Sequence, residues 1–167
     1  MTWLTIPLDD ACNRDEFSCG NDRLDFYLKR QVSQDIKRKL TACFVLPGMD
    51  NRLVGYYTLS NDIIPAEQLP ELFRKKMPRS YSNLPATLLG RLAVDDRFKG
   101  RGYGRLLLID ALRRSSAASS AVGSMAVVVD PISQDAVAFY AGFGFINLPD
   151  SGRMFMPMKT ITGIIPR

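Results

Sequence analysis

Histidine is absent from this 167-residue sequence, and its absence excludes several kinds of chemistry. Without imidazole the chain has no Ser-His-Asp or Cys-His catalytic group, and it lacks the commonest metal ligand. The cysteines are Cys12, Cys19 and Cys43, an odd number without the C-x-x-C spacing of a zinc site or a redox pair. We therefore expect reduced cysteines and no metal site.

Long apolar runs are also missing. The longest apolar pieces, such as residues 106–109 and 126–129, are far shorter than the roughly 20 residues that a membrane-spanning helix needs. The amino terminus mixes charged and apolar residues, which is not the pattern of a secretory signal. We expect no membrane contact and a cytoplasmic location. With 46% hydrophobic residues, the chain is expected to form one compact domain over residues 1–167.

Basic residues exceed acidic ones by 22 to 17, and the resulting net charge of +5 favours an anionic partner. Arg23, Arg30 and Lys37 recur every seven residues, so that on a helix they would form one cationic stripe. Each of these residues has the alternative interpretation of solvated surface. Together they favour a polyanion, because every neutralised phosphate releases counterions. A second basic cluster contains Arg74, Lys75, Lys76 and Arg79.

Hydrophobic periodicity predicts a mixed α and β chain. Helices are expected at 22–38, within 67–76, at 102–116 and at 133–141, and strands at 41–46, 52–60, 86–94, 124–129 and 153–160. Asn21 or Asp22 can cap the first helix, and the turn-rich residues 47–51 indicate a hairpin. In the helix at 102–116, the apolar face is expected opposite Asp110, Arg113 and Arg114. The stretch 86–129 then has the strand, loop, helix and strand of a β-α-β unit.

The loop 97–104 lies between a predicted strand and a predicted helix start, where backbone N–H groups have no intrahelical acceptor. Gly100, Gly102 and Gly104 can take positive φ and let the backbone approach a phosphate. The alternative is a flexible turn with solvated basic residues. Neither the Walker loop nor the G-x-G-x-x-G spacing is present. The loop is nevertheless suited to bind a diphosphate through its glycines and basic residues. Charge-assisted contacts are expected from Arg97, Lys99 and Arg101.

Two motifs in order resemble the GNAT N-acetyltransferases. Residues 97–102 match the R-x-x-G-x-G signature for acetyl-CoA, and residues 136–145 are similar to the family's A-x-x-F-Y-x-x-x-G-F segment. The resemblance implies the α/β (α+β) GNAT acyl-CoA N-acyltransferase fold. Its central sheet is mixed and mostly antiparallel, with splayed central strands and flanking helices. It also implies an acetyl-CoA-dependent N-acetyltransferase.

The same resemblance implies roles for individual residues. Tyr140 takes the place of the tyrosine near the CoA sulfur, where it would act as the catalytic general acid, although a core aromatic beside Phe139 is the alternative. Many members carry an asparagine before this helix, whereas Ser133 and Gln134 stand here. The residues implied to bind acetyl-CoA are Leu92, Ala93 and Val94 by backbone pairing with pantetheine, and Arg97, Lys99, Gly100, Arg101, Gly102, Tyr103 and Gly104 in the pyrophosphate loop.

Most of the chain is similar to one branch of that family, the GNAT toxins of bacterial toxin-antitoxin pairs. The similarity rests on the patterns at residues 17–21, 53–60 and 89–95. It implies acetylation of the α-amino group of aminoacyl-tRNA, inhibition of translation, a small DNA-binding antitoxin as partner, and a dimer as a common state. The residues expected to bind tRNA are Arg30, Lys37, Arg74, Lys76 and Arg91.

The scarcity of glutamate agrees with an α-amine substrate. Residues 86–94 contain no acid, and glutamate occurs only at Glu16, Glu67 and Glu71, so a strong base is not evident. An α-amine with a pKa of about 7.7 is partly neutral at pH 7, whereas lysine near 10.4 is almost fully charged. Asp95, Asp96 or water remain possible proton relays. A small amine or a protein amino terminus is the alternative substrate, and a noncatalytic nucleic-acid-binding or acyl-CoA-sensing domain is the alternative class.

Overall fold

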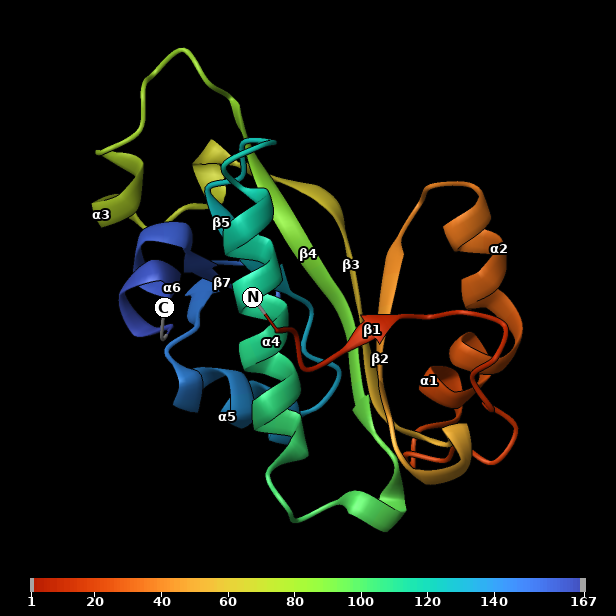
Figure 1. Ribbon diagram of the computed structural model, residues 1–167. Helices are drawn as coiled ribbons and strands as arrows, with labels where there is room; N and C mark the ends of the chain where they lie inside the picture. The colour runs from red at the N-terminus through yellow and green to blue at the C-terminus, as the bar shows by residue number, and fades with distance from the viewer. Residues whose placement is uncertain (1, 166–167) are drawn as a thin grey trace. The chain divides into compact units, whose positions relative to one another are not determined.

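The structure is a computed structural model that describes residues 2–165 (Figure 1). Its backbone contacts divide the chain into two compact units. The first unit runs to Ser60 and resumes at Gly90–Leu112, and the second combines Asn61–Leu89 with the chain after Leu112. Each unit is therefore built from two stretches that are distant along the sequence.

Seven strands follow the hydrogen-bonded order β1-β2-β3-β4-β5-β7-β6. Two long strands, β3 (Leu53–Pro65) and β4 (Asn83–Val94), contribute residues to both units. β4 pairs with β5 in parallel, whereas the pairs β1–β2, β2–β3, β5–β7 and β6–β7 are antiparallel. This mixed and mostly antiparallel sheet, flanked by helices, confirms the expected fold class.

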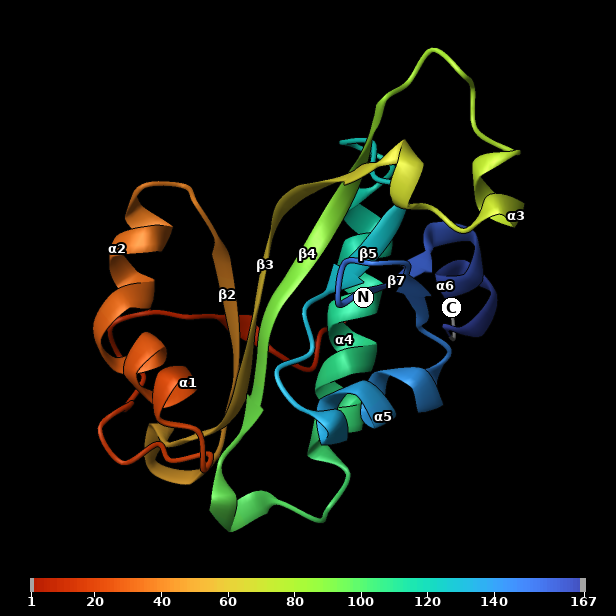
Figure 2. The ribbon, with the colours of Figure 1, turned by 180° about the vertical axis from the view of Figure 1, so that it is seen from behind.

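The first unit begins with the short strand β1 (Ile6–Pro7), which pairs with β2 (Ala42–Pro47). β2 and β3 form the expected hairpin, and a 3-10 turn, η2 (Met49–Asn51), connects them. The first helical segment lies beside β2 in both views of the chain (Figure 1, Figure 2). The Asn21 side chain accepts hydrogen bonds from two backbone N–H groups and caps that segment, as the sequence predicts.

This helical segment differs from the predicted regular helix at its centre. It consists of α1 (Asp22–Phe26), the π-helical turn η1 (Tyr27–Gln31) and α2 (Val32–Lys37). The N–H of Val32 donates to the carbonyl of Tyr27, the i→i+5 bond of a π turn. The wider turn rotates the residues after it relative to those before it. A seven-residue spacing therefore does not return to one face, and the expected straight stripe is wrong.

Helix α4 (Tyr103–Ala118) buries most of the apolar face that the sequence predicts, including Leu107, Leu108 and Leu112. Asp110, however, is buried rather than on the polar face. Its carboxylate accepts hydrogen bonds from the hydroxyls of Thr5, at 2.5 Å, and Tyr57, at 2.7 Å. The prediction was wrong for Asp110 because polar groups distant in sequence provide hydrogen bonds to its buried carboxyl group.

The second unit contains the parallel step of the sheet. Thr87 to Leu89 of β4 pair with Val127 to Val129 of β5 (Ala126–Val129), which confirms the two strands of the predicted β-α-β unit. β7 (Arg153–Pro157) pairs with β5 and with β6 (Ile146–Leu148). The helices of this unit are α3 (Glu71–Arg74), α5 (Gln134–Phe143) and α6 (Met158–Ile164), with a 3-10 turn η3 (Ala66–Gln68).

Several predicted boundaries in this unit are wrong. The strand expected to end at residue 60 continues to Pro65 and buries Ile64, and the helix expected within 67–76 is reduced to the single turn of α3. The last strand ends at Pro157, where α6 begins and buries Met158 and Ile161. Strand β6 has only three residues, too few to show an alternating pattern.

The residues 2–165 contain no helix long and apolar enough to cross a membrane. The cysteines Cys12, Cys19 and Cys43 are free, and burial raises the pKa of the Cys19 thiol to about 11 and that of Cys43 to about 12. Both thiols are therefore protonated near neutral pH.

Gly55 in β3 lies where the strand packs tightly against α4 and β4. A Cβ at this position would meet the Leu107 Cδ1 atom at 2.6 Å and the backbone oxygen of Ala93 at 2.7 Å. We expect Gly55→Ala to lower the free energy of unfolding by about 1–3 kcal/mol, because the close-packed backbone cannot yield. Gly163→Ala in α6, where the added methyl meets nothing within 4 Å, is expected to raise it by about 0.5–1 kcal/mol. Urea unfolding of both variants measures these free energies of unfolding. Equal changes in the two variants would contradict the prediction.

Candidate functional site

The Gly-rich loop connects the end of β4 to the start of α4. A 3-10 turn, η4 (Asp96–Phe98), follows β4, and α4 begins at Tyr103. Gly100 and Gly102 adopt φ values of +78° and +82°, and a Cβ added at either would meet nothing within 4 Å. Glycine is therefore required at these two positions for backbone conformation, and the space beside the loop is open. This confirms the predicted use of positive φ at two glycines, whereas Gly104 lies in the first turn of α4.

The start of α4 presents backbone donors at the end of this loop. The N–H of Leu106 donates to the carbonyl of Gly102, so the three preceding N–H groups have no acceptor within the helix. The helix has 16 residues, and its dipole adds positive potential at the same end. A loop of this geometry is suited to bind a phosphate or diphosphate through its backbone.

A buried carboxylate holds the base of the loop. Asp95 is 1% exposed and accepts hydrogen bonds from the backbone N–H groups of Ser18, at 3.2 Å, and Arg97, at 2.9 Å. The Arg97 guanidinium donates to both carboxylate oxygens, through Nε at 2.9 Å and Nη2 at 3.2 Å. Burial works against the charge, but the hydrogen bonds from Arg97 and Ser18 outweigh it and lower the pKa of Asp95. An ionised carboxylate in this role is a poor proton relay.

Lys99 makes a second connection between the loop and the residues before the first helix. Its ammonium donates to the carbonyl of Cys19 and pairs with Asp96 at 3.0 Å. The N–H of Asp96 donates to the carbonyl of Ser18 at 2.7 Å. The Phe17-Ser-Cys-Gly-Asn21 pattern therefore has a structural use, since its backbone supports the loop. Sequence reasoning identified this pattern only through the resemblance, because nothing local predicts which loop it contacts.

The cations of the loop are accordingly not equivalent. Arg97 is engaged with Asp95 and lies 3.8 Å from the carboxylate of Glu16, and Lys99 is engaged with Cys19 and Asp96. The exposed Arg101 guanidinium lies 5.7 Å from the centre of the Phe98 ring. Arg101 is thus the cation with the least engaged head group in this loop. Phosphate contacts from all three remain predictions.

The last residues of β4 lie beyond its pairing with β5. The registered pairs of the two strands end at Leu89 and Val129, whereas β4 continues to Val94. Ala93 is buried, and Leu92 and Val94 are partly buried. Their side chains pack, while their backbone lies outside the β4–β5 ladder. This is compatible with the predicted pairing of Leu92, Ala93 and Val94 with an extended ligand.

Tyr140 lies on α5 in the second unit. Ser133 caps this helix by accepting from the N–H of Ala136, and Gly144 ends it at a φ of 107°. The Tyr140 ring is 9% exposed and lies 5.2 Å from the ring centres of both Phe139 and Phe145. Burial raises its pKa to about 12, and its hydroxyl has no hydrogen-bond partner among residues 2–165. A protonated phenol without a partner is available to donate to a ligand.

The residues expected to bind tRNA differ in their surroundings. Arg30 is exposed within the π turn η1, Lys37 is exposed at the end of α2, and Arg74 and Lys76 are exposed in the second unit. Arg91 is partly buried, and its guanidinium carbon lies 3.4 Å from the centre of the Tyr27 ring. The guanidinium of Arg91 therefore already makes a cation–π interaction within the protein.

Comparison with known proteins identifies the family of this chain. Residues 18–160 match the family model described as an acetyltransferase (GNAT) domain. The chain belongs to the GNAT acetyltransferase family, and the Gly-rich loop and Tyr140 lie in its matched region. Within the part of the chain that the structure covers, no group of three or more acidic or cysteine side chains is placed to hold a metal ion.

Two curated relatives cover nearly the whole chain. A tRNA-acetylating toxin of Mycobacterium tuberculosis is 34% identical over 159 residues, which is 95% of this chain and 93% of the relative. The probable toxin TacT of Sinorhizobium fredii is 29% identical over 169 aligned positions, with the same coverage of 95% and 93%.

Solved structures of related toxins have the same fold. A tyrosine-to-phenylalanine mutant of KacT has a TM-score of 0.89 at 32% identity, covering 96% of this chain and 98% of its own. AtaT in complex with acetyl-methionyl-tRNAfMet has a TM-score of 0.88 at 29% identity, covering 96% and 97%. AtaTR bound with acetyl-CoA has a TM-score of 0.83 at 30% identity, covering 96% of both chains.

The hydrogen bonds of Asp95 predict an acid-sensitive contribution to stability. Because the folded-state pKa is lowered, the contribution is present above the unfolded value of about 3.9 and is lost as the pH falls through the folded value. We expect Asp95→Asn to lower the free energy of unfolding at pH 7 by about 1–3 kcal/mol. The exposed neighbour Asp96, changed to Asn, is expected to cost less than about 1 kcal/mol.

Urea unfolding between pH 7 and pH 3 measures both variants against the unchanged protein. The difference in the free energy of unfolding between the unchanged protein and Asp95→Asn is expected to narrow as the pH falls. A difference that stays constant with pH would show that the charge of Asp95 does not stabilise the loop.

Proposed function

We propose that this protein is a toxin that transfers the acetyl group of acetyl-CoA to the α-amino group of aminoacyl-tRNA and so blocks translation in the cytoplasm. The observation that carries this proposal is the open Gly100–Gly102 loop at the start of α4, in a chain similar over 95% of its length to a tRNA-acetylating toxin. We further propose that residues 1–167 act as one GNAT domain.

The backbone of the loop is the proposed site for the acetyl donor. Acetyl-CoA supplies an activated thioester and carries a pyrophosphate. The N–H groups between Lys99 and Gly104 would bind that pyrophosphate, with Arg101 adding charge. Leu92, Ala93 and Val94 would pair with the pantetheine arm through their backbone. The neighbour AtaTR, solved with acetyl-CoA, supports this assignment.

Transfer of the acetyl group requires two proton movements. The attacking amine loses one proton, and the CoA thiolate gains one as the carbon–sulfur bond breaks. Tyr140 is the proposed donor to sulfur, because its hydroxyl is protonated and has no partner among residues 2–165. General acid catalysis of this kind contributes typically 10²–10⁴-fold.

The proposed acceptor is an α-amine because the site offers no strong base. No acid occurs within residues 86–94, and Asp95 is held ionised by Arg97 and Ser18. An α-amine with a pKa of about 7.7 is partly neutral without help, whereas a lysine side chain is not. The aminoacyl end of a charged tRNA provides such an amine on a polyanion. The neighbour AtaT, solved with acetyl-methionyl-tRNAfMet, supports this choice.

The proposed partners follow from charge and from the neighbours. Exposed Arg30, Lys37, Arg74 and Lys76 would contribute to tRNA binding, and Arg91 would do so only where its stacking on Tyr27 permits. A small DNA-binding antitoxin is proposed as the cognate partner, because structures of AtaT with the antitoxin AtaR and of KacTA with DNA are among the neighbours. A homodimer is proposed as the assembly.

Turnover of labelled acetyl-CoA with a mixture of charged tRNAs tests the proposed function. We expect label on the aminoacyl group of one or more tRNAs, and none with uncharged tRNA. Gly102→Glu should abolish transfer, because its side chain places a negative charge beside the phosphate-binding N–H groups. Gly152→Glu is the matched control, since Gly152 also has positive φ, at 71°, and open space. Label on free amines or protein amino termini instead, or no transfer at all, would contradict the proposal.

Tyr140→Phe removes a single hydroxyl from α5. We expect the chemical step in single turnover to slow by at least tenfold with saturating charged tRNA, while acetyl-CoA affinity changes little. The ring contacts with Phe139 and Phe145 should persist, because they do not involve the hydroxyl. Rapid-quench measurement of acetylated tRNA is the readout. A single-turnover rate near that of the unchanged protein would make Tyr140 a core aromatic only.

A further inference from the structure

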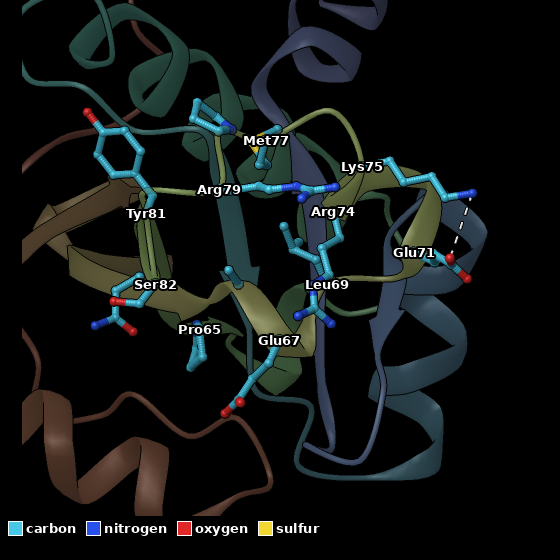
Figure 3. Close-up of a pocket in the computed structure, with 13 residues that line it drawn as sticks. Pro65, Glu67, Leu69, Glu71, Arg74, Lys75, Met77, Arg79, Tyr81 and Ser82 are labelled. Atoms are coloured by element: carbon cyan, nitrogen blue, oxygen red, sulfur yellow. Dashed lines mark ion pairs between the residues drawn. The ribbon is translucent and has the colours of Figure 1, made fainter.

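A hollow of about 980 Å³ lies in the second unit, and a single segment of chain between β3 and β4 forms its whole wall (Figure 3). The segment runs from Pro65 to Asn83, and the N–H of Ala66 donates to the carbonyl of Ser82 at 2.9 Å, which brings its two ends together. The volume is at the upper end of the roughly 300–1,000 Å³ found for ligand pockets. It is therefore large enough for one or more nucleotides.

The wall of the hollow carries cations that the protein itself does not neutralise. Lys75 pairs with Glu71 at 3.7 Å, and Glu67 also lines the hollow. Arg74 and Arg79 line it as well, and neither makes an ion pair within residues 2–165. Figure 3 shows these two guanidinium groups in the middle of the lining residues, with the Lys75–Glu71 pair at one side.

An exposed aromatic ring lies on the other side of the hollow. Tyr81 is 56% exposed and follows a turn in which its N–H donates to the carbonyl of Pro78 at 3.3 Å. Figure 3 shows its ring at one edge of the lining residues, projecting outward from the chain, with the two arginines nearer the middle. A solvent-exposed ring beside unpaired cations is the composition of sites that stack bases and contact the backbone of single-stranded nucleic acid.

We propose that this hollow, defined by Arg74, Arg79 and Tyr81, binds unpaired nucleotides of an RNA. Tyr81 stacks on a base, and the two arginines contact the adjoining phosphates. The inference rests on the proposed function, because the aminoacyl group of a charged tRNA is attached to an unpaired 3′ end. It adds Arg79 and Tyr81 to the RNA-binding residues and assigns single-strand selectivity to this segment.

The shape and lining favour unpaired over paired RNA. Bases in a duplex cover each other's faces, so that an aromatic ring can stack only on a base that has left the helix. A concave wall also suits an extruded base better than the regular backbone of a duplex. A protein partner fits less well, because the aliphatic side chains of the wall, Leu69 and Met77, are buried or half-buried.

Three variants separate stacking from general packing and from charge. Tyr81→Leu keeps an apolar side chain and removes the ring, whereas Tyr81→Phe keeps the ring. We expect Tyr81→Leu to raise the KM for charged tRNA roughly tenfold with little change in kcat, and Tyr81→Phe to behave as the unchanged protein. Arg79→Ala should raise the same KM and reduce the slope of log KM against log salt by about one. Lys159→Ala, an exposed cation on α6, is the charge control.

Two further substrates make the outcome independent of the proposed function. An aminoacyl methyl ester, which has no RNA, should react with all variants at the same rate. A labelled single-stranded RNA pentanucleotide should bind the unchanged protein and Tyr81→Phe more tightly than Tyr81→Leu, and an RNA hairpin stem should not distinguish them. The pentanucleotide binding assay tests the hollow independently of enzyme activity. A protein that does not acetylate charged tRNA would therefore overturn the proposed function but not the assignment of the hollow. Equal pentanucleotide affinity of Tyr81→Leu and Tyr81→Phe would overturn the assignment of the hollow.

Discussion

The buried carboxylate of Asp95 receives four hydrogen bonds, and together with the backbone N–H of the same residue they connect three parts of the first unit. Its own N–H donates to Val54 of β3, and its oxygens accept from the segment before the first helix and from the loop. The stabilisation comes from hydrogen bonding that outweighs the cost of burying the charge. The start of the Gly-rich loop is thereby fixed before any ligand is bound.

This constraint divides the loop into two parts, a fixed base at residues 95–99 and an open crest at residues 100–102. Arg97 and Lys99 are used at the base, where they meet Asp95, Asp96 and the carbonyl of Cys19. The crest contains Gly100 and Gly102, which adopt positive φ because they lack a Cβ atom, and the space beside both is open. The proposed anion binding at the crest would therefore depend chiefly on backbone N–H groups and the start of α4 rather than on side-chain charge. A preorganised backbone site of this kind costs little reorganisation when a ligand binds.

The sequence predicted those features whose cause is local. The Asn21 cap, the glycines with positive φ and the two strands of the β-α-β unit follow from residue type and spacing, and the structure confirms them. The π turn at Tyr27–Gln31 was missed because no residue marks the extra backbone step. The last strand was predicted to continue to residue 160, whereas α6 begins at Met158, because a buried apolar residue gives the same signal in a helix as in a strand. Asp110 was misplaced because its partners Thr5 and Tyr57 lie far along the chain. The predicted roles of the site residues stay predictions.

The absence of histidine has a consequence for how protons move in such an enzyme. Burial keeps Tyr140 protonated up to a pKa of about 12, and hydrogen bonds keep Asp95 ionised well below neutrality. Neither group changes its protonation between pH 6 and pH 9, a range in which the protein has no imidazole to titrate. An α-amine with a pKa of about 7.7 does titrate there. Under the proposed mechanism, a rise of rate with pH in that range would belong to the substrate, because the neutral amine would attack and Tyr140 would be a donor of fixed protonation state. The proposed mechanism would therefore favour amines of low pKa, since these are partly neutral without a base on the protein.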